Sequence, residues 1–404
     1  MEEKSPVYLV MVTTNNNNKY YRMIPHGDTF EVEYGRVGAS CQHASYPMSQ
    51  WNKKYNEKIK KGYVDQTHLV QDLIQKEKPK GKDGYKEIEN KVIAEIVQRL
   101  QDMAHQKIQA NYKVSSQQVT QAMVDEAQKV IDKLMQREEV EDFNNTLLEL
   151  FSVIPRKMGN VNDYLSRSKE DFARILKDEQ DLLDVMRGQV VTHTVQDEPD
   201  TNDVEEKQET ILEAMGLEFE ETTEEDVRMI KSLLGDCRDK FYRAWRVKNI
   251  KTQKRFDEFV NKEHISKTKL LWHGSRNENW WSIINTGLVL RPTNAVITGK
   301  MFGYGIYYAP KARKSLGYTS LSGSYWARGN SNSAFMALMD VAYGKPYDVH
   351  SFDSKYYDFN YERLQKTCPG ANCLHAHAGS MLRNDEIIVY KEDQCTIKYL
   401  VELR

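Results

Sequence analysis

The chain has 404 residues, more than one hydrophobic core usually supports, and so we expect two or three domains. Its hydrophobic fraction of 40% is ordinary for a globular protein, and no stretch has the long apolar run of a membrane helix, so we expect no membrane partner. The formal net charge of −2 hides an uneven distribution, because WNKKYNEKIKKGY (residues 51–63) is basic and residues 196–226 are strongly acidic.

The N-terminus and the cysteines indicate an intracellular protein. MEEKSPVYLV carries acids and no cleavable apolar segment. The five cysteines are scattered and odd in number, unlike a disulfide framework. We therefore expect the nucleus in a eukaryote, or the cytoplasm and nucleoid in a bacterium.

Residues 1–76 are predicted to form a small domain around an antiparallel sheet. VYLVMV, YYRMI and FEVEYGRV alternate apolar and polar residues with the period of a half-buried strand. The asparagine run 15–18 is expected to be an exposed polar loop, and the lysine-rich piece that follows the strands is expected to be a covering helix. KEKPKGKDG, residues 76–84, reads as a linker.

Residues 85–190 are predicted to be all-helical. Apolar side chains recur every four positions at Ile88, Val92, Ile96 and Leu100. A second apolar set starts at Val119, with Ser115 and Ser116 as candidate N-caps. Helical patterning returns in NNTLLELFSVI and in DFARILKDEQDLLDVMRG, which is expected to end at Gly188. Residues 191–216 are acidic and are predicted to be a linker.

Residues 217–404 are predicted to form an α+β domain with two packed sheets, which makes the chain a multidomain α+β protein. Short pieces rich in aromatic and β-branched residues are separated by turn signals. These pieces are GLEFEET, FYRAWRVKN, KLLWHGS, GIYYAP, EIIVYK and CTIKYLVEL.

Three motifs in this region are candidates for chemistry. LLWHGSRNENWW places His273 and Gly274 directly after a buried strand, which has no packing use for them. MFGYGIYYAP lacks the third glycine of a dinucleotide-binding fingerprint and leads into a strand, so that interpretation fails. CPGANCLHAH offers four zinc ligands, but their spacing fits neither a CxxC nor an HxxxH pair, so we expect a loop leading into a strand, and no metal. Those four are Cys368, Cys373, His375 and His377.

Taken in order, LLWHGSRNENWW, GLVLRPTNAVITGKMFGYGIYYAPKARKSLGY and NDEIIVYKEDQCTIKYLVEL resemble the catalytic domain of the poly(ADP-ribose) polymerases. The family's His-Tyr-Glu signature falls on His273, Tyr307 and Glu386. YGRVG, residues 34–38, resembles the WGR domain of the DNA-dependent members, with Tyr34 in place of the signature tryptophan. LLELFSVIPRK resembles their regulatory helical domain.

The resemblance implies an ADP-ribosyltransferase that consumes NAD+ as a substrate and needs no metal. Tyr307 and Tyr318 would hold the nicotinamide ring between them through cation–π attraction. The backbone of Gly274 and the hydroxyl of Ser315 would bind the carboxamide. The adenosine ribose would contact His273, Ser275 and Asn279.

Glu386 is predicted to carry the rate. A carboxylate beside the nicotinamide ribose can bind its 2′-hydroxyl, stabilise the developing positive charge and polarise an acceptor hydroxyl. In the family this glutamate favours polymer synthesis. However, CPGANCLHAHAGSML departs from the lysine- and glycine-rich pattern of the polymerising members.

The resemblance also implies control by damaged DNA. The helical domain would shield the NAD+ site until the WGR-like domain engages a strand break. Phosphate contacts would come from Arg36, Lys53, Lys54 and Lys58. Protein acceptors would include the chain itself, which would be monomeric without DNA, and the acidic linker around Glu205, Glu206 and Glu209 is the candidate for automodification.

Two other functions stay open at this point. One is single-unit ADP-ribose transfer, or NAD+ hydrolysis, by an enzyme of the same fold. The other is a catalytically silent protein that binds DNA breaks, although a silent domain has no physical need to keep His273, Tyr307 and Glu386 together.

Overall fold

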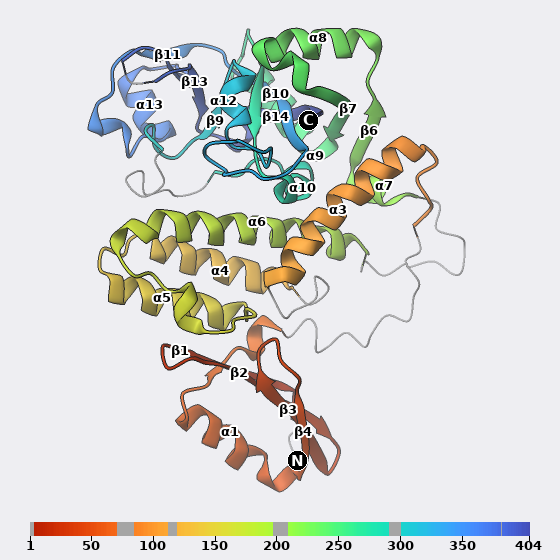
Figure 1. The fold of residues 1–404 in the computed structure, drawn as a ribbon, viewed down its shortest axis with the longest axis vertical. Helices are drawn as coiled ribbons and strands as arrows, with labels where there is room; N and C mark the ends of the chain where they lie inside the picture. Colours follow the sequence, from red (N-terminus) through yellow and green to blue (C-terminus); the bar gives the residue numbers. More distant parts are fainter. Residues whose placement is uncertain (1–3, 71–84, 112–118, 197–208, 291–299, 381) are drawn as a thin grey trace. The chain divides into compact units, whose positions relative to one another are not determined.

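The computed structural model describes residues 4–70, 85–111, 119–196, 209–290, 300–380 and 382–404 (Figure 1). They belong to two compact units. The first unit is Met1–Lys82 with His105–Val190, and the second unit is Asp83–Ala104 with Val191–Arg404. Within the described ranges, no helix has the length and apolar character that crossing a membrane would need. The predicted linker 76–84 lies outside them.

The first unit begins with the predicted antiparallel sheet, in the order β4-β3-β2-β1-β5. Its strands are β1 (Val7–Thr13), β2 (Asn17–His26), β3 (Thr29–Arg36), β4 (Gln42–Pro47) and β5 (Val64–Asp65). The predicted covering helix is α1 (Trp51–Lys60), and short 3-10 turns flank it at Met48–Gln50 and Thr67–Leu69. Trp51 packs edge-on against the buried ring of Phe30 and closes the core on that face.

The asparagine run is only partly the exposed loop that its polarity predicted. Asn18 is fully buried, and its Nδ2 donates a hydrogen bond to the backbone oxygen of Arg156 at 2.9 Å. A buried amide needs such a partner, because an unpaired one costs about 1 to 3 kcal/mol. Asn18 therefore joins the sheet to the helical part of the same unit.

The helical region contains α3 (Lys91–Asn111), α4 (Gln121–Leu134), α5 (Val140–Val153) and α6 (Phe172–Gln196), with 3-10 turns at Val161–Tyr164 and Lys169–Asp171. The first half of α3, up to Ala104, belongs to the second unit. Thr120, whose Oγ1 accepts from the Met123 amide at 3.1 Å, caps α4. The predicted caps Ser115 and Ser116 lie outside the described residues.

The predicted end of the last helix at Gly188 is wrong. α6 continues to Gln196, six residues into the predicted linker 191–216. Buried Met186 and Val190 lie on either side of the glycine. Their packing outweighs the roughly 1 kcal/mol that a glycine costs inside a helix. The same predicted linker also contains α7 (Ile211–Met215), which begins with a capping box between Thr210 and Glu213.

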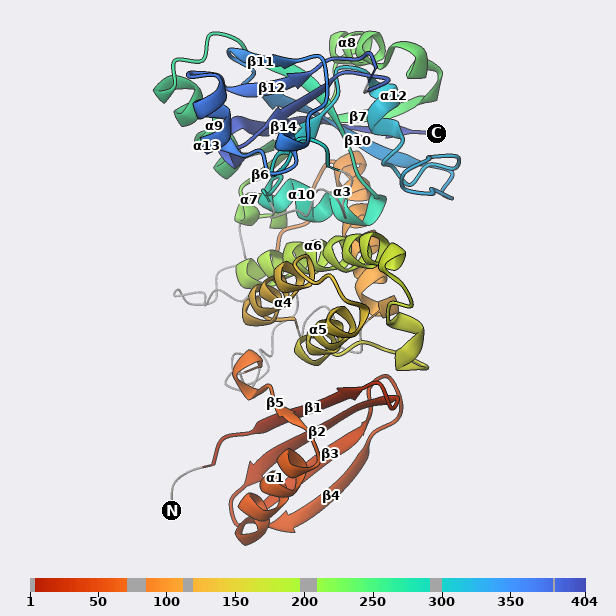
Figure 2. The same ribbon diagram turned by 90° about the vertical axis from the view of Figure 1, so that its left-hand side faces the viewer.

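The second unit holds two sheets, as predicted (Figure 2). The five-stranded antiparallel sheet has the order β6-β7-β14-β10-β8. These strands are β6 (Leu217–Glu221), β7 (Phe241–Asn249), β14 (Cys395–Leu403), β10 (Ala334–Val341) and β8 (Lys269–Gly274). The four-stranded sheet has the order β11-β12-β13-β9, in which only β11 and β12 are parallel. They are β11 (Pro346–Val349), β12 (Cys373–Ala376), β13 (Glu386–Val389) and β9 (Ile306–Tyr308).

Helices and 3-10 turns connect these strands. The helices are α8 (Glu224–Leu234), α9 (Ile250–Lys262), α10 (Trp280–Thr286), α12 (Ala312–Leu316) and α13 (Tyr361–Thr367). The turns are Gly235–Lys240, Asn277–Asn279, Ser354–Tyr356 and Glu392–Gln394. All six pieces that the sequence predicted as strands form strands. The inner strand β10 was missed because AFMALMDV is almost entirely buried and shows no alternation.

One backbone bridge joins the two sheets next to the candidate site. Trp272 of β8 and Ala309, directly after β9, exchange N–H···O bonds of 2.9 and 3.0 Å. Trp272 is 1% exposed and packs into the core of the larger sheet, so the bridge is rigidly held. It fixes the ends of β8 and β9 side by side.

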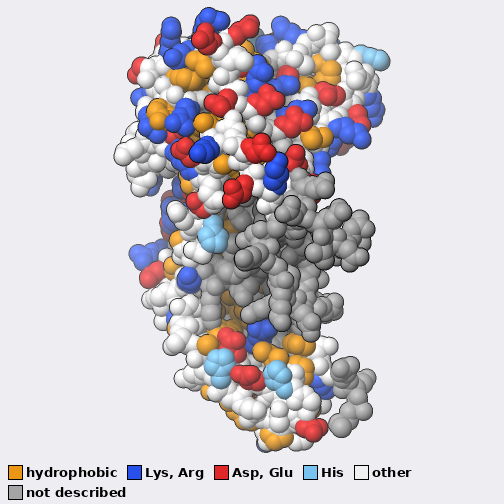
Figure 3. Space-filling model, turned by 90° about the vertical axis from the view of Figure 1, so that its right-hand side faces the viewer, with side chains coloured by type: hydrophobic (Ala, Val, Ile, Leu, Met, Phe, Trp, Pro, Cys, Tyr) orange, Lys and Arg blue, Asp and Glu red, His pale blue; other side chains and the backbone are white. Residues whose placement is uncertain are grey.

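The surface of the second unit mixes charges of both signs. Figure 3 shows acidic and basic side chains interspersed over this unit on the face that it presents. Ion pairs of this unit include Lys248 with Glu218 at 3.0 Å. On the face shown, charges of both signs therefore lie next to one another.

Candidate active site

The structure brings His273, Tyr307 and Glu386 together on adjoining strands of the second unit. His273 precedes the last residue of β8, Tyr307 is the middle residue of β9, and Glu386 opens β13. Tyr307 pairs with Ile388 in the antiparallel register of β9 and β13. The predicted triad thus rests on three strands that backbone hydrogen bonds hold together.

His273 is oriented by the neighbouring strand. Its Nδ1 lies 3.1 Å from the backbone oxygen of Tyr307, which can only accept, so Nδ1 carries the proton and Nε2 keeps its lone pair. Burial lowers the pKa of His273 to about 4; the bond to Tyr307 opposes this shift and the charge of Lys300 adds to it. The imidazole is therefore neutral at pH 7 and suits hydrogen bonding to a sugar hydroxyl.

The two tyrosines predicted around the nicotinamide ring are held in different ways. The Tyr307 hydroxyl accepts from the Phe302 amide at 3.0 Å and donates to the Gly303 oxygen at 3.1 Å, which fixes its ring. Tyr318 is 36% exposed, and its ring stacks on Trp326 with centroids 6.2 Å apart. Of the two tyrosines predicted to hold the ring, Tyr307 is therefore fixed by hydrogen bonds to the backbone, whereas Tyr318 stays accessible to a ligand.

Gly274 and Ser315 touch through their backbones. A Cβ on Gly274 would collide with the Ser315 carbonyl, so any side chain here would push α12 away from β8. The Ser315 hydroxyl donates to the Trp272 oxygen at 3.0 Å and is nearly buried. The missing side chain of Gly274 thus allows α12 to pack directly against β8, a reason that the sequence did not reveal. It also leaves the Gly274 backbone open to close approach.

Ser275 and Asn279 form a polar pair just beyond β8. Asn279 Nδ2 donates to the Ser275 hydroxyl at 3.0 Å. The Asn279 Oδ1 atom is buried and, within the described ranges, has no hydrogen-bond partner. A buried acceptor of this kind is costly unless a ligand satisfies it, which fits the predicted contact with a ribose hydroxyl.

Lys314 is a residue of the candidate site that the sequence reasoning missed. Its Nζ lies 2.6 Å from Glu386 Oε1, and both side chains are largely buried, at 19% and 11% exposure. Burial lowers the pKa of Lys314, but the charge of Glu386 and the hydrogen bond to it raise that pKa above its usual value overall. The ammonium also lies 5.8 Å from the centre of the Tyr318 ring.

A weak signal for Lys314 was present in the sequence. It directly precedes Ser315 in α12 and stands four residues before Tyr318, which follows that helix. The arrangement places an ammonium, a carboxylate and two aromatic rings around one site. Such a set can bind a cationic ring, orient a sugar hydroxyl and stabilise an oxocarbenium-like centre.

The residues predicted to bind DNA differ in their surroundings. Lys53 of α1 is exposed, whereas Lys54 lies over Tyr46 at 4.1 Å from the ring centre. Lys58 lies over Tyr21 at 4.2 Å, and desolvation, followed by the charge of Lys61, lowers its pKa. The exposed Lys53 side chain is able to contact a phosphate. The DNA-binding roles of all three lysines stay predictions.

Arg36 contacts the helical part of its own unit. Its Nη2 donates to the backbone oxygens of Met158 and Gly159 at 3.1 and 2.7 Å and to Asn16 Oδ1 at 2.8 Å. Asn18 and Arg36 thus connect the sheet to residues 156–159, which follow α5. We call this set of contacts the junction. This position was not foreseen, and the predicted phosphate contact of Arg36 stays a prediction.

Two family models match the chain. Residues 224–404 match the poly(ADP-ribose) polymerase catalytic domain, and residues 5–70 match the WGR domain. The fold and the site accordingly define an ADP-ribosyltransferase that uses NAD+.

Relatives from a virus and from human support the same assignment. Invertebrate iridescent virus 6 has a putative poly [ADP-ribose] polymerase-like protein 100L that is 32% identical over 168 residues, 41% of this chain and 87% of that protein. Its uncharacterized protein 101L is 33% identical over 232 residues, 56% of this chain and 94% of that protein. Human poly [ADP-ribose] polymerase 2 is 40% identical over 84 residues, 21% of this chain and 13% of the human protein. The chain belongs to the poly(ADP-ribose) polymerase family.

Proposed function

We propose that this protein is activated by DNA strand breaks and then transfers ADP-ribose from NAD+ to proteins, itself included. It extends the first ADP-ribose into poly(ADP-ribose). The observation that carries the chemistry is the buried Glu386 carboxylate at the start of β13, paired with Lys314 and set beside His273 and Tyr307. Control of this activity by DNA is supported by the WGR domain, whose sheet contacts the helical part of the same unit through the junction.

In this proposal the bond between the nicotinamide nitrogen and C1′ of the ribose breaks, and its electron pair leaves with the nicotinamide. Glu386 accepts a hydrogen bond from the ribose 2′-hydroxyl and stabilises the positive charge that develops at C1′. The acceptor oxygen then bonds to C1′ and gives up its proton towards the Glu386 carboxylate. Lys314 orients that carboxylate before the substrate arrives.

Damaged DNA would act as the switch. A strand break would meet the sheet and α1 through salt-dependent phosphate contacts from lysines such as Lys53. Binding can favour an active state only if DNA interacts more strongly with that state. The site of action would be wherever the damaged DNA lies, the nucleus in a eukaryote or the nucleoid in a bacterium.

Single-unit transfer is the second candidate, and one observation favours it. The predicted acceptor-side segment CPGANCLHAHAGSML, residues 368–382, carries His375 and His377 and departs from the lysine- and glycine-rich pattern of polymerising members. An acceptor sugar would meet different partners there. The mobility of the automodified protein on a gel separates the two, since polymer gives a ladder or smear and a single unit gives one small shift.

The first test is nicotinamide release from NAD+ with and without a short duplex that carries a single-strand break. We expect release to rise with the nicked duplex and to fall about 10² to 10³-fold in Glu386→Gln. Glu362→Gln is the matched control, because Glu362 also pairs with a lysine, Lys366, at 2.7 Å but on the surface. Equal release with and without DNA would refute the switch, and full activity of Glu386→Gln would refute the assigned chemistry.

A further inference from the structure

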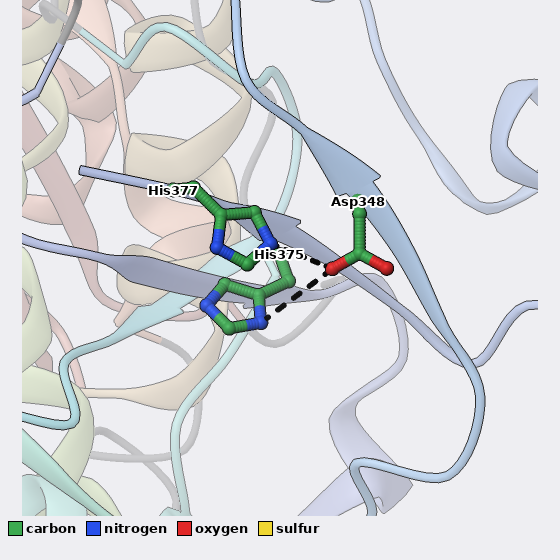
Figure 4. A group of neighbouring side chains, drawn as sticks. All are labelled: Asp348, His375 and His377. Carbon is green, nitrogen blue, oxygen red and sulfur yellow. Dashed lines mark hydrogen bonds and ion pairs between the residues drawn. The ribbon is translucent and has the colours of Figure 1, made fainter. Parts of the chain in front are cut away.

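A cluster of two histidines and two aspartates lies at one end of the four-stranded sheet. Asp348 of β11 and His375 of β12 are directly paired in the parallel register, and His377 follows β12 (Figure 4). Asp385 directly precedes β13. The exposed fractions of the His375 and His377 side chains are 11% and 27%, so the imidazoles are largely withdrawn from solvent.

Three potential ligand atoms of this cluster converge. His377 Nε2 lies 2.7 Å from Asp348 Oδ1, and His375 Nδ1 lies 3.9 Å from the same oxygen, as the dashed lines in Figure 4 mark. One ligand atom from each of the three residues lies within 4.8 Å of the others. The two imidazole rings stack with centroids 3.9 Å apart, so both direct a nitrogen towards the same carboxylate.

Asp385 hydrogen-bonds His375 and lies near His377, on the side of the two imidazoles away from Asp348. Its Oδ2 lies 2.9 Å from His375 Nε2 and 3.9 Å from His377 Nδ1, the nitrogens on the side away from Asp348. Its other oxygen accepts from the Ala378 amide at 2.9 Å, which fixes the carboxylate. Histidines that bind a metal usually donate their second ring N–H to a carboxylate in this way, and that bond sets the tautomer.

Hydrogen bonding alone could explain part of this arrangement, since the Tyr343 hydroxyl lies 2.9 Å from His375 Nδ1. Two neutral rings can also donate one N–H each, from His375 Nε2 to Asp385 at 2.9 Å and from His377 Nε2 to Asp348 at 2.7 Å. These bonds do not by themselves require one nitrogen of each ring to converge on Asp348 Oδ1. A cation between Asp348 and the two rings uses that convergence, because His375 Nδ1 and His377 Nε2 both bind it while His375 Nε2 keeps its bond to Asp385.

We propose that Asp348, His375 and His377 bind one divalent transition-metal ion, with Zn2+ the best match. Two imidazoles and one carboxylate form a donor set that zinc favours, with ligand distances of about 2.0 to 2.2 Å, so the three side chains close in on the ion. A water molecule takes the fourth position. The Tyr343 hydroxyl turns away from His375 Nδ1 as the ion binds.

This site differs from the four-ligand zinc site that the sequence analysis considered and rejected. The Cys373 thiol is buried and donates to the Tyr343 oxygen at 3.2 Å, and the described metal-competent group contains no cysteine. The new third ligand, Asp348, comes from a strand that the sequence analysis did not foresee. The ion would brace β12, where Ala376 pairs directly with Glu386 of β13.

The test uses the untagged full chain, stripped of metal with a chelator and titrated with Zn2+ against a chromophoric indicator. We expect one tight equivalent, and a loss of affinity of about 100-fold or more in His377→Ala and in Asp348→Asn. Elemental analysis after dialysis should give one zinc per wild-type chain. His43→Ala is the control, because His43 also contacts a carboxylate, Glu31, at 3.0 Å, and a thiol, Cys41, at 3.3 Å, but outside this cluster.

Binding that is absent, or that is equally tight in wild type, His377→Ala and Asp348→Asn, would overturn the proposal. So would a loss of the tight equivalent in His43→Ala alone. Circular dichroism checks that the variants fold, and Asp348→Asn changes an exposed side chain, so it decides the matter if His377→Ala misfolds.

Discussion

At the scale of single residues, the pair of Lys314 and Glu386 is the feature that most sharpens the chemistry. A carboxylate alone at the start of β13 would be free to rotate. The Lys314 ammonium at 2.6 Å holds it in one orientation. Because α12 sits directly on β8 through Gly274, the lysine cannot easily move away.

Replacing Lys314 by methionine keeps the length of the side chain and removes the charge. We expect the rate of nicotinamide release to fall about 10-fold or more, because Glu386 loses its orienting partner in a largely buried site. The matched control is Lys311→Met, one turn earlier and exposed, which should behave as wild type. Equal rates in the two variants would show that the ion pair has no part in turnover.

At the scale of elements, the first half of α3 is anchored to the second unit by Arg99. Its Nη1 lies 2.9 Å from Oε1 of Glu402 in β14, and its Nη2 donates to the Ser333 hydroxyl at 2.8 Å. The Glu402 side chain is 1% exposed, so its charge needs this partner. The nearest other cation, Arg404, lies 3.5 Å away and makes only a partial substitute.

Arg99→Met should destabilise the second unit by about 2 kcal/mol, because it leaves a buried carboxylate short of its donor. Arg243→Met is the matched control. Arg243 of β7 lies 4.0 Å from Glu95, which is on α3 as Arg99 is, and both side chains of this pair are exposed. Its loss should therefore change the free energy of unfolding by less than about 0.5 kcal/mol. Urea unfolding followed by tryptophan fluorescence measures both, and equal effects would contradict the anchoring role.

At the scale of the whole molecule, the junction is the described route by which DNA at the sheet could affect helices. Asn18 and Arg36 donate to backbone oxygens of Arg156, Met158 and Gly159. Arg156 continues inward through a bidentate pair with Glu179 of α6, with both bonds at 2.6 Å. A displacement of the sheet would therefore act directly on the packing between α5 and α6.

Under the proposed function, Arg36→Ala should separate DNA binding from activation. We expect the affinity for a nicked duplex to fall only as much as the loss of one positive charge requires, and the DNA-dependent rise in nicotinamide release to disappear. Arg22→Ala, on β2 of the same sheet, removes the same charge away from the junction and should keep the activation. Fluorescence anisotropy gives the affinities, and loss of activation in both variants would argue against a coupling role.

Local pattern sufficed for much of this protein. The alternation in FEVEYGRV and the four-residue recurrence from Val92 to Leu100 predicted a strand and a helix, and the structure has both, β3 and α3. The order of the motifs around His273, Tyr307 and Glu386 was likewise enough to predict the triad, and the structure places the three residues on adjoining strands. Their types indicate the chemistry that they would carry, with an imidazole, an aromatic ring and a carboxylate.

Only the tertiary structure decided which partners these residues meet. Glu386 pairs with Lys314, Arg36 points to Gly159 rather than outward, and Asp348 joins His375 across two parallel strands. None of these contacts follows from periodicity, since each links positions far apart in the chain. Their geometry depends on how the elements pack, and packing is set by the buried surface as a whole rather than by any short run of residues.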